Sequence, residues 1–259
     1  MLAVIRGGGD LATGVTWRLT RAGVDVVVAE LEDPLTVRRT VAMSSAVTEG
    51  AVDVEGMVGR LASDPTEATT IAAGGEVAVL VSPSLPPVDA DVVVDARLAK
   101  RNLDTTIDDA PLVIGLGPGF TAGVDCDGVV ETLRGPRLGR LLLTGSATAN
   151  TATPGIIGDH GRARVLRAPV EGSVCWQVAI GDRVEGGQAL GRVAKVELVA
   201  PFTGVVRGLI RPGRQVEAGL KIGDVDPRLD CSPHEISDKA LAVGGGVLEA
   251  VTAWLNRSP

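Results

Sequence analysis

The chain has 259 residues, a formal net charge of −7 and a pI of about 5.0. A net negative charge argues against the basic face of a nucleic-acid-binding protein, and a chain with no tyrosine and two phenylalanines has few aromatic side chains on which bases could stack. We therefore expect no nucleic-acid partner. The apolar runs are shorter than the roughly 18 residues of a membrane-spanning helix, and the N-terminus lacks a signal-peptide pattern, so we expect a cytoplasmic protein with no membrane partner.

The first 30 residues predict a strand, a loop, a helix and a second strand. Residues 2–5 are an apolar run, and apolar residues then recur every four positions from Leu11 to Leu19, which predicts a helix. Gly23 is suited to end that helix, and the nearly continuous apolar run 24–29 is typical of a strand buried on both faces. This order predicts the start of a βαβ unit.

The loop between the first strand and the helix resembles a phosphate-binding turn. Gly7, Gly8 and Gly9 let the backbone approach a phosphate, and the helix that follows offers free N–H groups. Glu30 follows the second strand, at the spacing of an acid that binds the ribose in dinucleotide enzymes. The alternative is a tight structural turn in which Asp10 caps the helix.

Asp10 separates these two interpretations. A carboxylate at this place would repel a pyrophosphate unless a basic group or a metal offsets its charge. Arg6 is the nearest basic residue in the sequence. We therefore expect Asp10 to orient Arg6, to bind a metal, or to cap the helix.

Alternating elements continue through the first 150 residues. Such alternation predicts an α/β protein with a Rossmann-like doubly wound sheet. Further helices are predicted from Asp33-Pro34, over 55–62 and over 65–73, and further strands over 76–81, 91–95, 112–115 and 141–143.

Three polar clusters follow predicted strands, where ligands bind in such sheets. They lie at residues 95–102, 115–123 and 150–155, and a basic segment at 131–137 lies between the last two. Lysine and arginine can gather on one anion, and glycine-rich turns can bind it, although solvated loop charges and plain turns are the alternative. The candidate binding residues here are Lys100, Asn102, Gly115, Gly117, Gly119, Arg134 and Asn150, together with Gly7, Gly8, Gly9, Asp10 and Glu30.

The cysteines and histidines predict neither a metal site nor a disulfide framework. Three cysteines lie far apart, and two histidines are too few for most metal sites. Cys126 lies between Asp125 and Asp127, whose charges would raise the pKa of its thiol and weaken it as a nucleophile. The sequence therefore predicts no catalytic residue and leaves the reaction, if any, unassigned.

The second half contains an internal repeat. Residues 168–193 align with 200–225 at an offset of 32, and ten of the aligned positions are identical, among them Pro169/Pro201, Gly172/Gly204 and Val184/Val216. The pattern resembles the barrel-sandwich hybrid of biotinyl and lipoyl carrier domains, so we expect a small all-β module over 161–227. Lys195 lies between the halves, but the hairpin looks too short for a carrier lysine, so neither biotin nor lipoate is expected.

The C-terminal residues 232–255 show a helical face that Gly244, Gly245 and Gly246 interrupt. Three glycines inside a helix are unfavourable, so they predict a break or a point of close packing. We expect residues 228–259 to complete a first domain formed by residues 1–160.

Several blocks of the chain resemble a known family. The blocks "RGGGDLATGV", "AKRNL", "APLVIGLGPGFTAGVD", "RGLIRPG" and "GGGVLEA" look like those of the YqeB family, the accessory proteins of selenium-dependent molybdenum hydroxylases. The N-terminal part is also similar in kind to XdhC-type insertion factors, which have a nucleotide-binding Rossmann-like domain. The chain departs from the family at Ala152, where a glycine is usual after Asn-Thr.

The resemblance implies a maturation factor. Its partner would be the apoenzyme of a molybdenum hydroxylase such as a xanthine dehydrogenase, and its ligand a nucleotide or a molybdopterin-type phosphate. Two alternatives stay open: an NAD(P)-dependent oxidoreductase that uses Gly7, Gly9 and Glu30, and a non-enzymatic scaffold that docks a hydroxylase. Each is compatible with a homo-oligomer.

Overall fold

The computed structural model describes residues 1–149 and 162–256. The chain divides into two compact units, each described by itself below. The first comprises Met1–Pro34, Ala42–Thr151 and Ile236–Pro259, and the second comprises Leu35–Val41 and Ala152–Glu235. Within the described ranges, no helix has both the length and the apolarity needed to cross a membrane.

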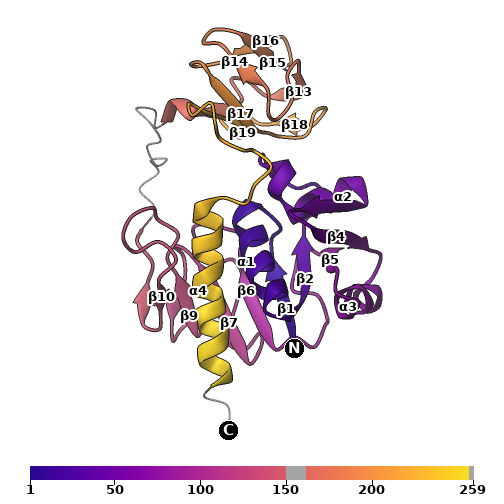
Figure 1. Ribbon diagram of the computed structural model, residues 1–259, viewed down its shortest axis with the longest axis vertical. Coiled ribbons are helices and arrows are strands. Elements are labelled where there is room, and N and C mark those ends of the chain that lie inside the picture. Colours follow the sequence, from indigo (N-terminus) through magenta and orange to yellow (C-terminus); the bar gives the residue numbers. More distant parts are fainter. Residues whose placement is uncertain (150–161, 257–259) are drawn as a thin grey trace. The chain divides into compact units, whose positions relative to one another are not determined.

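The first unit is built on a nine-stranded mixed sheet (Figure 1). Its seven central strands are parallel, and the two edge strands β3 and β10 run antiparallel to their neighbours. In spatial order the strands are β10 (Leu141–Leu142), β9 (Gly128–Val130), β7 (Leu112–Leu116), β6 (Val92–Asp95), β1 (Leu2–Arg6), β2 (Asp25–Glu30), β5 (Val77–Val81), β4 (Met57–Ala62) and β3 (Ala51–Val54).

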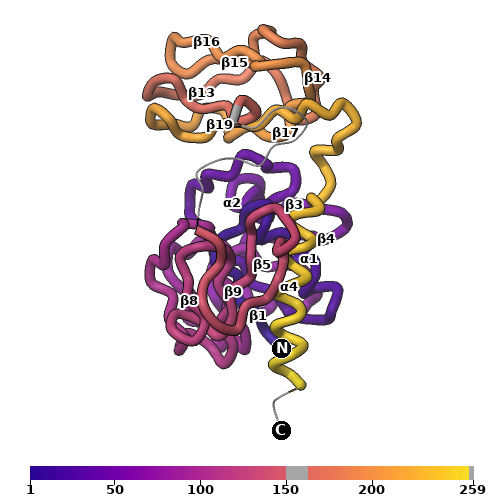
Figure 2. Tube along the Cα trace, turned by 90° about the vertical axis from the view of Figure 1, so that its left-hand side faces the viewer, coloured from indigo at the N-terminus to yellow at the C-terminus, as the bar shows by residue number. Residues whose placement is uncertain are grey.

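Both faces of this sheet are covered, which explains why its central strands are almost entirely apolar. Helices α1 (Asp10–Arg21) and α4 (Asp238–Leu255) lie side by side on one face (Figures 1 and 2). The alternate strand residues, such as Val4 and Val27, join Ala68 and Ala72 of helix α3 (Pro65–Ala73) in a second buried cluster.

Short elements complete the first unit and its connections. They are the 3-10 helix η2 (Met43–Ser45), helix α2 (Ala46–Glu49) and a two-stranded sheet of β8 (Thr121–Ala122) and β11 (Gly145–Ser146). Helix α3 begins as predicted, because Asp64 caps it by accepting hydrogen bonds from the amides of Thr66 and Glu67, and Pro65 holds its first position.

The predicted fold class, a Rossmann-like doubly wound sheet with a barrel-sandwich-hybrid module, is corrected by this topology. The sheet is mixed, and among the described residues α-helices lie in only three of the connections between its strands: α1 between β1 and β2, the single-turn α2 between β2 and β3, and α3 between β4 and β5. The connections 82–91, 96–111 and 117–127 contain no helix, because they lack a helical apolar period and are rich in proline, glycine and aspartate. The described chain has four α-helices and, besides the large sheet, antiparallel sheets of two, four and four strands.

Two predicted helices are absent from the described chain. Residues 51–62 form the hairpin of β3 and β4 instead, closed by a two-residue turn in which Glu55 and Gly56 have φ angles of 52° and 80°. Both central residues of such a turn need positive φ, and this turn overrides the weak helical pattern. No helix begins at Asp33-Pro34, because the chain runs on as an irregular strap, residues 35–41, that belongs to the second unit.

The second unit contains two four-stranded antiparallel sheets. Their orders are β12-β19-β17-β14 and β16-β15-β13-β18. The strands are β12 (Val165–Arg167), β13 (Gly172–Trp176), β14 (Arg183–Val184), β15 (Ala189–Val193), β16 (Val196–Val199), β17 (Gly204–Leu209), β18 (Gln215–Val216) and β19 (Lys221–Asp226), preceded by the 3-10 helix η3 (Arg162–Arg164).

The strands of this unit follow the 32-residue offset of the sequence. β13, β14 and β15 begin at 172, 183 and 189, and β17, β18 and β19 begin at 204, 215 and 221. Each sheet combines strands of both repeats, β14 with β17 and β19 in one and β13 and β15 with β18 in the other, so one repeat cannot form either sheet alone.

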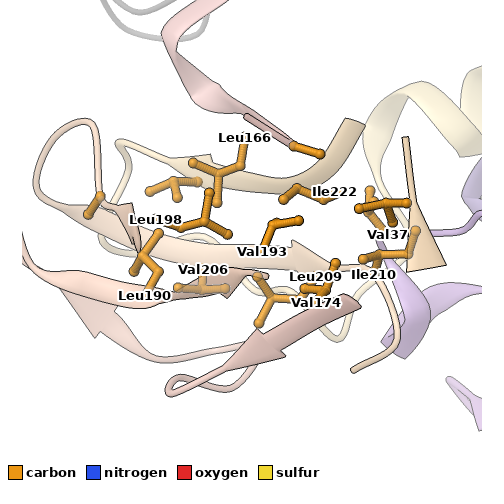
Figure 3. Close-up of a cluster of buried hydrophobic side chains, with 14 of the residues drawn as sticks. Val37, Leu166, Val174, Leu190, Val193, Leu198, Val206, Leu209, Ile210 and Ile222 are labelled. Atoms are coloured by element: carbon orange, nitrogen blue, oxygen red, sulfur yellow. The ribbon is translucent and has the colours of Figure 1, made fainter. Parts of the chain in front are cut away.

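The second unit has one apolar core that the strap completes (Figure 3). Leu190, Val193, Val206 and Ile222 are fully buried in it, and Val37 of the strap packs among them. The 3-10 helix η1 (Arg39–Val41) ends the strap, and the Nε of Arg39 donates to the carbonyl of Leu209 at 2.8 Å. The strap therefore belongs to the second unit and not, as the sequence predicts, to the first domain.

Lys195 lies at the tip of the hairpin that joins the two repeats. β15 and β16 pair up to Val193 and Val196, so Ala194 and Lys195 alone form the turn, with Ala194 at a φ of 51°. Lys195 is exposed. Lys195 thus lies in a tight two-residue turn, and the expectation that it carries neither biotin nor lipoate stays a prediction.

Helix α4 runs without a break through its three glycines. A Cβ on Gly244 would lie 2.4 Å from the carbonyl oxygen of Gly14 on α1, and one on Gly246 would lie 2.1 Å from that of Gly139. Gly245 has nothing within 4 Å of such an atom. Gly244 and Gly246 are thus positions of close backbone packing, one of the two outcomes that the sequence predicted.

The glycines of α4 predict opposite effects of the same substitution. Gly244→Ala should lower the free energy of unfolding by about 2 kcal/mol, because the new methyl group meets backbone that cannot move aside. Gly245→Ala should raise it by up to about 1 kcal/mol, because alanine has the higher helix propensity. Urea unfolding of both variants, followed by tryptophan fluorescence, measures this, and equal effects would contradict the packing.

Candidate functional site

The predicted binding residues gather largely at one edge of the large sheet. β2, β1, β6 and β7 are parallel neighbours, so the segments that follow them leave at the same edge. Gly7–Asp10 follow β1, Glu30 ends β2, residues 96–102 follow β6, and Gly117–Gly119 follow β7. We call this set of segments the carboxyl edge.

The first glycine turn packs closely against its neighbours. Gly7 has a φ of +94°, and a Cβ there would lie 3.2 Å from the backbone of Ala96 and Arg97. A Cβ on Gly8 would lie 2.8 Å from the amide nitrogen of Ser44. These two glycines therefore allow segments of the chain itself to approach the turn.

Two amides of this turn are occupied within the protein. The amide of Gly7 donates to the carbonyl of Ala29 at 2.7 Å, and that of Gly8 donates to the carboxylate of Glu30 at 2.8 Å. The other carboxylate oxygen of Glu30 accepts from the amide of Leu31 at 2.7 Å. An anion aimed at Gly8 would have to displace Glu30.

Helix α1 begins directly after this turn. Its N-cap is Gly9, which has no side chain with which to cap the first turn, and Asp10 is the first helical residue. The N-terminal amides of a helix attract negative charge, and they are the part of this turn best suited to a phosphate.

The sequence analysis proposed that Asp10 orients Arg6. Arg6 instead forms a buried network with Asp104 and Thr105. The side chain of Arg6 is 3% exposed and donates to Asp104 and to the hydroxyl of Thr105, both at 2.8 Å. Thr105 in turn donates to Asp95 at 2.7 Å. The hydrogen bond from Arg6 is the largest effect on Asp104 and lowers the pKa of that carboxyl, and Arg97 adds to it.

Arg97 joins the network at its solvent side. Its guanidinium binds Asp95 at 2.5 Å and Asp104 at 2.7 Å and is 19% exposed. Burial alone would lower the pKa of Arg97, but the hydrogen bonds and charges of Asp95 and Asp104 outweigh it and raise the pKa. The network thus holds a permanently charged arginine at the carboxyl edge.

The segment after β6 is held between the two glycine turns. Leu98 and Lys100 have φ angles of 54° and 65°, which cost of order 1 kcal/mol each for residues other than glycine. The side-chain amide of Asn102 donates to the carbonyl of Thr105 at 2.7 Å and to Asp125 at 3.1 Å, so Asn102 fixes this loop. Lys100 is exposed.

The second glycine turn is packed shut by its own neighbours. A Cβ on Gly115 would lie 2.4 Å from the ring of Phe120, and one on Gly117 would lie 2.5 Å from the hydroxyl of Thr132. A Cβ on Gly119 would lie 2.6 Å from the Cα of Arg101. These three glycines serve close packing, which leaves the first turn as the better place for a ligand.

Arg134 and Glu131 are engaged at the far end of the edge. Arg134 forms a two-pronged ion pair with Asp238 on α4, at 2.7 and 2.9 Å, and so has a partner other than the predicted ligand. Glu131 is 1% exposed and accepts from the amides of Leu133 and Thr148. Burial would raise the pKa of Glu131, but these hydrogen bonds lower it. Asn150, also predicted as a ligand contact, lies outside the described residues.

The second unit contains a polar cluster that the sequence analysis did not identify. Asp224 and Asp226 are 1% and 0% exposed and lie two residues apart on β19, so they share a face. The signal was present as two acids at alternate positions of an apolar strand. The arginine–aspartate cluster, as we call it, consists of Asp224 with Arg38 and Arg164, at 2.9 and 3.1 Å, and Asp226 with Arg207 and Arg228, at 3.1 and 2.8 Å.

Comparison with known proteins gives one relative along the whole chain. No family model matches. The chain is 47% identical over 260 residues to the uncharacterized protein YqeB of Escherichia coli K12, a match that covers 99% of this chain and 48% of YqeB. The chain therefore spans about half the length of that relative. This similarity supports the resemblance to YqeB proteins and, because the relative is uncharacterized, assigns no role.

Solved structures resemble the chain only distantly. An aspartoacylase family protein from Mesorhizobium loti shares 13% identity at a TM-score of 0.30, covering 88% of this chain and 85% of its own. The product-bound ectoine utilization protein EutE (DoeB) from Ruegeria pomeroyi shares 15% at 0.25, covering 86% and 57%. A succinylglutamate desuccinylase from Silicibacter shares 12% at 0.25, covering 86% and 84%. Such scores transfer neither fold nor activity to this chain.

The thiols of Cys126 and Cys175 should differ sharply in reactivity. Cys126 is fully buried, and burial followed by the charges of Asp125 and Asp127 raises the pKa of its thiol to about 11. Roughly one molecule in a thousand would then carry the thiolate at pH 8, whereas Cys175 is exposed. Alkylation at pH 8 with peptide mass spectrometry should label Cys175 at once and Cys126 only after unfolding. Rapid labelling of Cys126 in the native protein would reopen its role as a nucleophile.

Proposed function

We propose that this chain is an accessory factor for the maturation of selenium-dependent molybdenum hydroxylases. In this proposal its carboxyl edge holds a nucleotide or a molybdopterin-type phosphate for the hydroxylase apoenzyme. The pathway rests on the resemblance to the YqeB family, which the 47% identity to YqeB supports. The ligand class rests on the geometry of the carboxyl edge.

The observation that carries the ligand class is the arrangement of Gly9 and Glu30. The phosphate would lie at the first turn of α1, which Gly9 opens without a capping side chain. The Glu30 carboxylate, held by Gly8 at 2.8 Å, keeps further lone pairs that can accept hydroxyl groups of a sugar or pterin. Arg97 lies at the same edge and is partly exposed, with its charge balanced by Asp95 and Asp104.

Two other functions have an observation in their favour. Glu30, at the end of β2, is where an NAD-dependent oxidoreductase would hold a ribose. The close packing of Gly115, Gly117 and Gly119 favours a docking scaffold, because residues of the chain itself fill the space that a ligand would need at these glycines. The ligand that binds, if one does, separates the three functions.

Ligand binding should depend on Glu30. We expect calorimetry to show binding of CTP, ATP or a pterin phosphate, and Glu30→Gln to weaken it about tenfold, because a charged acceptor for ligand hydroxyls is lost. Glu49→Gln removes the same charge at an exposed position on α2 and should change nothing. Binding confined to NAD and lost in Glu30→Gln would favour the oxidoreductase, and the absence of any binding would favour the scaffold.

The pathway has its own test in cells. Selenium-75 labelling with and without the gene for this chain should show a labelled molybdenum hydroxylase only when the chain is present. The amount of hydroxylase polypeptide is measured in parallel, so that a loss of selenium is distinguished from a loss of enzyme. Unchanged labelling without the chain would exclude the maturation role.

A further inference from the structure

The chain on either side of the strap, residues 35–41, bonds to Gly8 in the first glycine turn. On the N-terminal side, the carboxylate of Glu30 accepts from the amide of Gly8 at 2.8 Å. On the C-terminal side, the amide of Ser44 donates to the carbonyl of Gly8 at 2.9 Å. One residue of the first unit thus holds both sides of the segment 31–43, which enters the second unit and returns.

The C-terminal side of the strap has a second anchor on helix α1. The amide of Met43 donates to the hydroxyl of Thr13 at 2.9 Å, and both residues are fully buried. The backbone also packs closely here, because a Cβ on Gly8 would lie 2.8 Å from the amide nitrogen of Ser44. Close-packed groups pass on a displacement and do not absorb it. A movement of the first glycine turn would therefore move the chain where the strap ends.

The strap itself is anchored on strand β17 of the second unit. Val37 is 8% exposed and belongs to the apolar core. Its carbonyl oxygen comes so near β17 that a Cβ on Gly208 would lie 2.8 Å from it. The Nε of Arg39 donates to the carbonyl of Leu209 at 2.8 Å. Release of the strap would open the core beside β17.

The connection between these two sets of anchors is short and buried. Arg39 bonds to the second unit, and Met43, which bonds to the first unit, follows four positions later. The residues next to Met43 on this path, Val41 and Ala42, are 4% and 0% exposed. A buried path of this length has no loose loop that could take up a displacement.

We propose that the strap couples the first glycine turn to the core of the second unit, so that loosening either one loosens the other. Coupling between two sites is reciprocal, so the effect must be measurable in both directions. A group bound at the first glycine turn would change, by the same route, how readily the second unit opens. The coupling belongs to the chain itself and does not rest on the function proposed for the carboxyl edge.

Hydrogen–deuterium exchange of the full chain, measured by mass spectrometry without any ligand, tests the first direction. Thr13→Val removes the acceptor for the amide of Met43 and keeps the shape of the side chain. It should raise the exchange of amides in residues 204–210 about fivefold, the lower end of couplings between separate sites. Thr16→Val makes the same change in the same helix, where the hydroxyl donates to Ala12, and should leave those amides unchanged.

The second direction starts from the strap. Val37→Ala should raise the exchange of the hydrogen-bonded amides of Met43 and Ser44, because the strap loses its contact with the core. Leu35→Ala changes a strap residue that is 51% exposed and should leave them unchanged. Amides of β7 report whether the first unit stays folded in each variant.

A replacement variant keeps the test decisive. If β7 shows that Thr13→Val is unfolded, Glu30→Gln, which weakens the hold on Gly8, should still raise exchange in residues 204–210 above that of Glu49→Gln. Equal exchange of residues 204–210 in Thr13→Val and Thr16→Val, or a response in one direction alone, would overturn the coupling. Neither measurement changes if the carboxyl edge binds no nucleotide or pterin.

Discussion

Direct contact between backbone segments is the constraint on which the first unit depends. α4 can lie on α1 only because Gly14 and Gly244 have no side chains where the helices meet. The same condition holds at Gly8 beside Ser44 and at Gly119 beside Arg101. The absence of a side chain at these glycines therefore sets how closely the elements approach one another. The shape of the candidate site depends on these short distances.

The carboxyl edge is supported by charges that compensate one another inside the protein. Arg6, Asp95 and Arg97 link the ends of β1 and β6, and Glu30 links the end of β2 to Gly8. A ligand at this edge would meet a surface whose polar groups are already oriented. Orientation of that kind favours binding without rearrangement, because little side-chain freedom remains to be lost.

The sequence predicted the parts of the fold that depend on local pattern. The strands around 2–5, 24–29 and 112–115 are continuous apolar runs, and the helix over 65–73 has a clear cap, so all four are confirmed. The hairpin at Glu55-Gly56 was missed because a turn without asparagine or aspartate is hard to recognise.

The candidate site was harder to predict. The sequence predicted that Gly7, Glu30 and Asn102 lie in one region, because each follows or ends a predicted parallel strand and the ends of parallel strands share an edge. It gave no means to tell a glycine that admits a ligand from one, such as Gly115, that admits Phe120. That distinction depends on contacts between residues distant in the chain, as does the gathering of Arg38 with Asp224 across 186 positions.

The strap at residues 35–41 has a consequence for how the second unit can be inherited or engineered. Val37 fills its core and Arg38 binds Asp224, yet both are encoded more than a hundred residues before the strands they join. A contiguous fragment cut from the second half would lack them. Such a fragment would therefore lose a core side chain and an ion pair that the complete chain supplies from its N-terminal part.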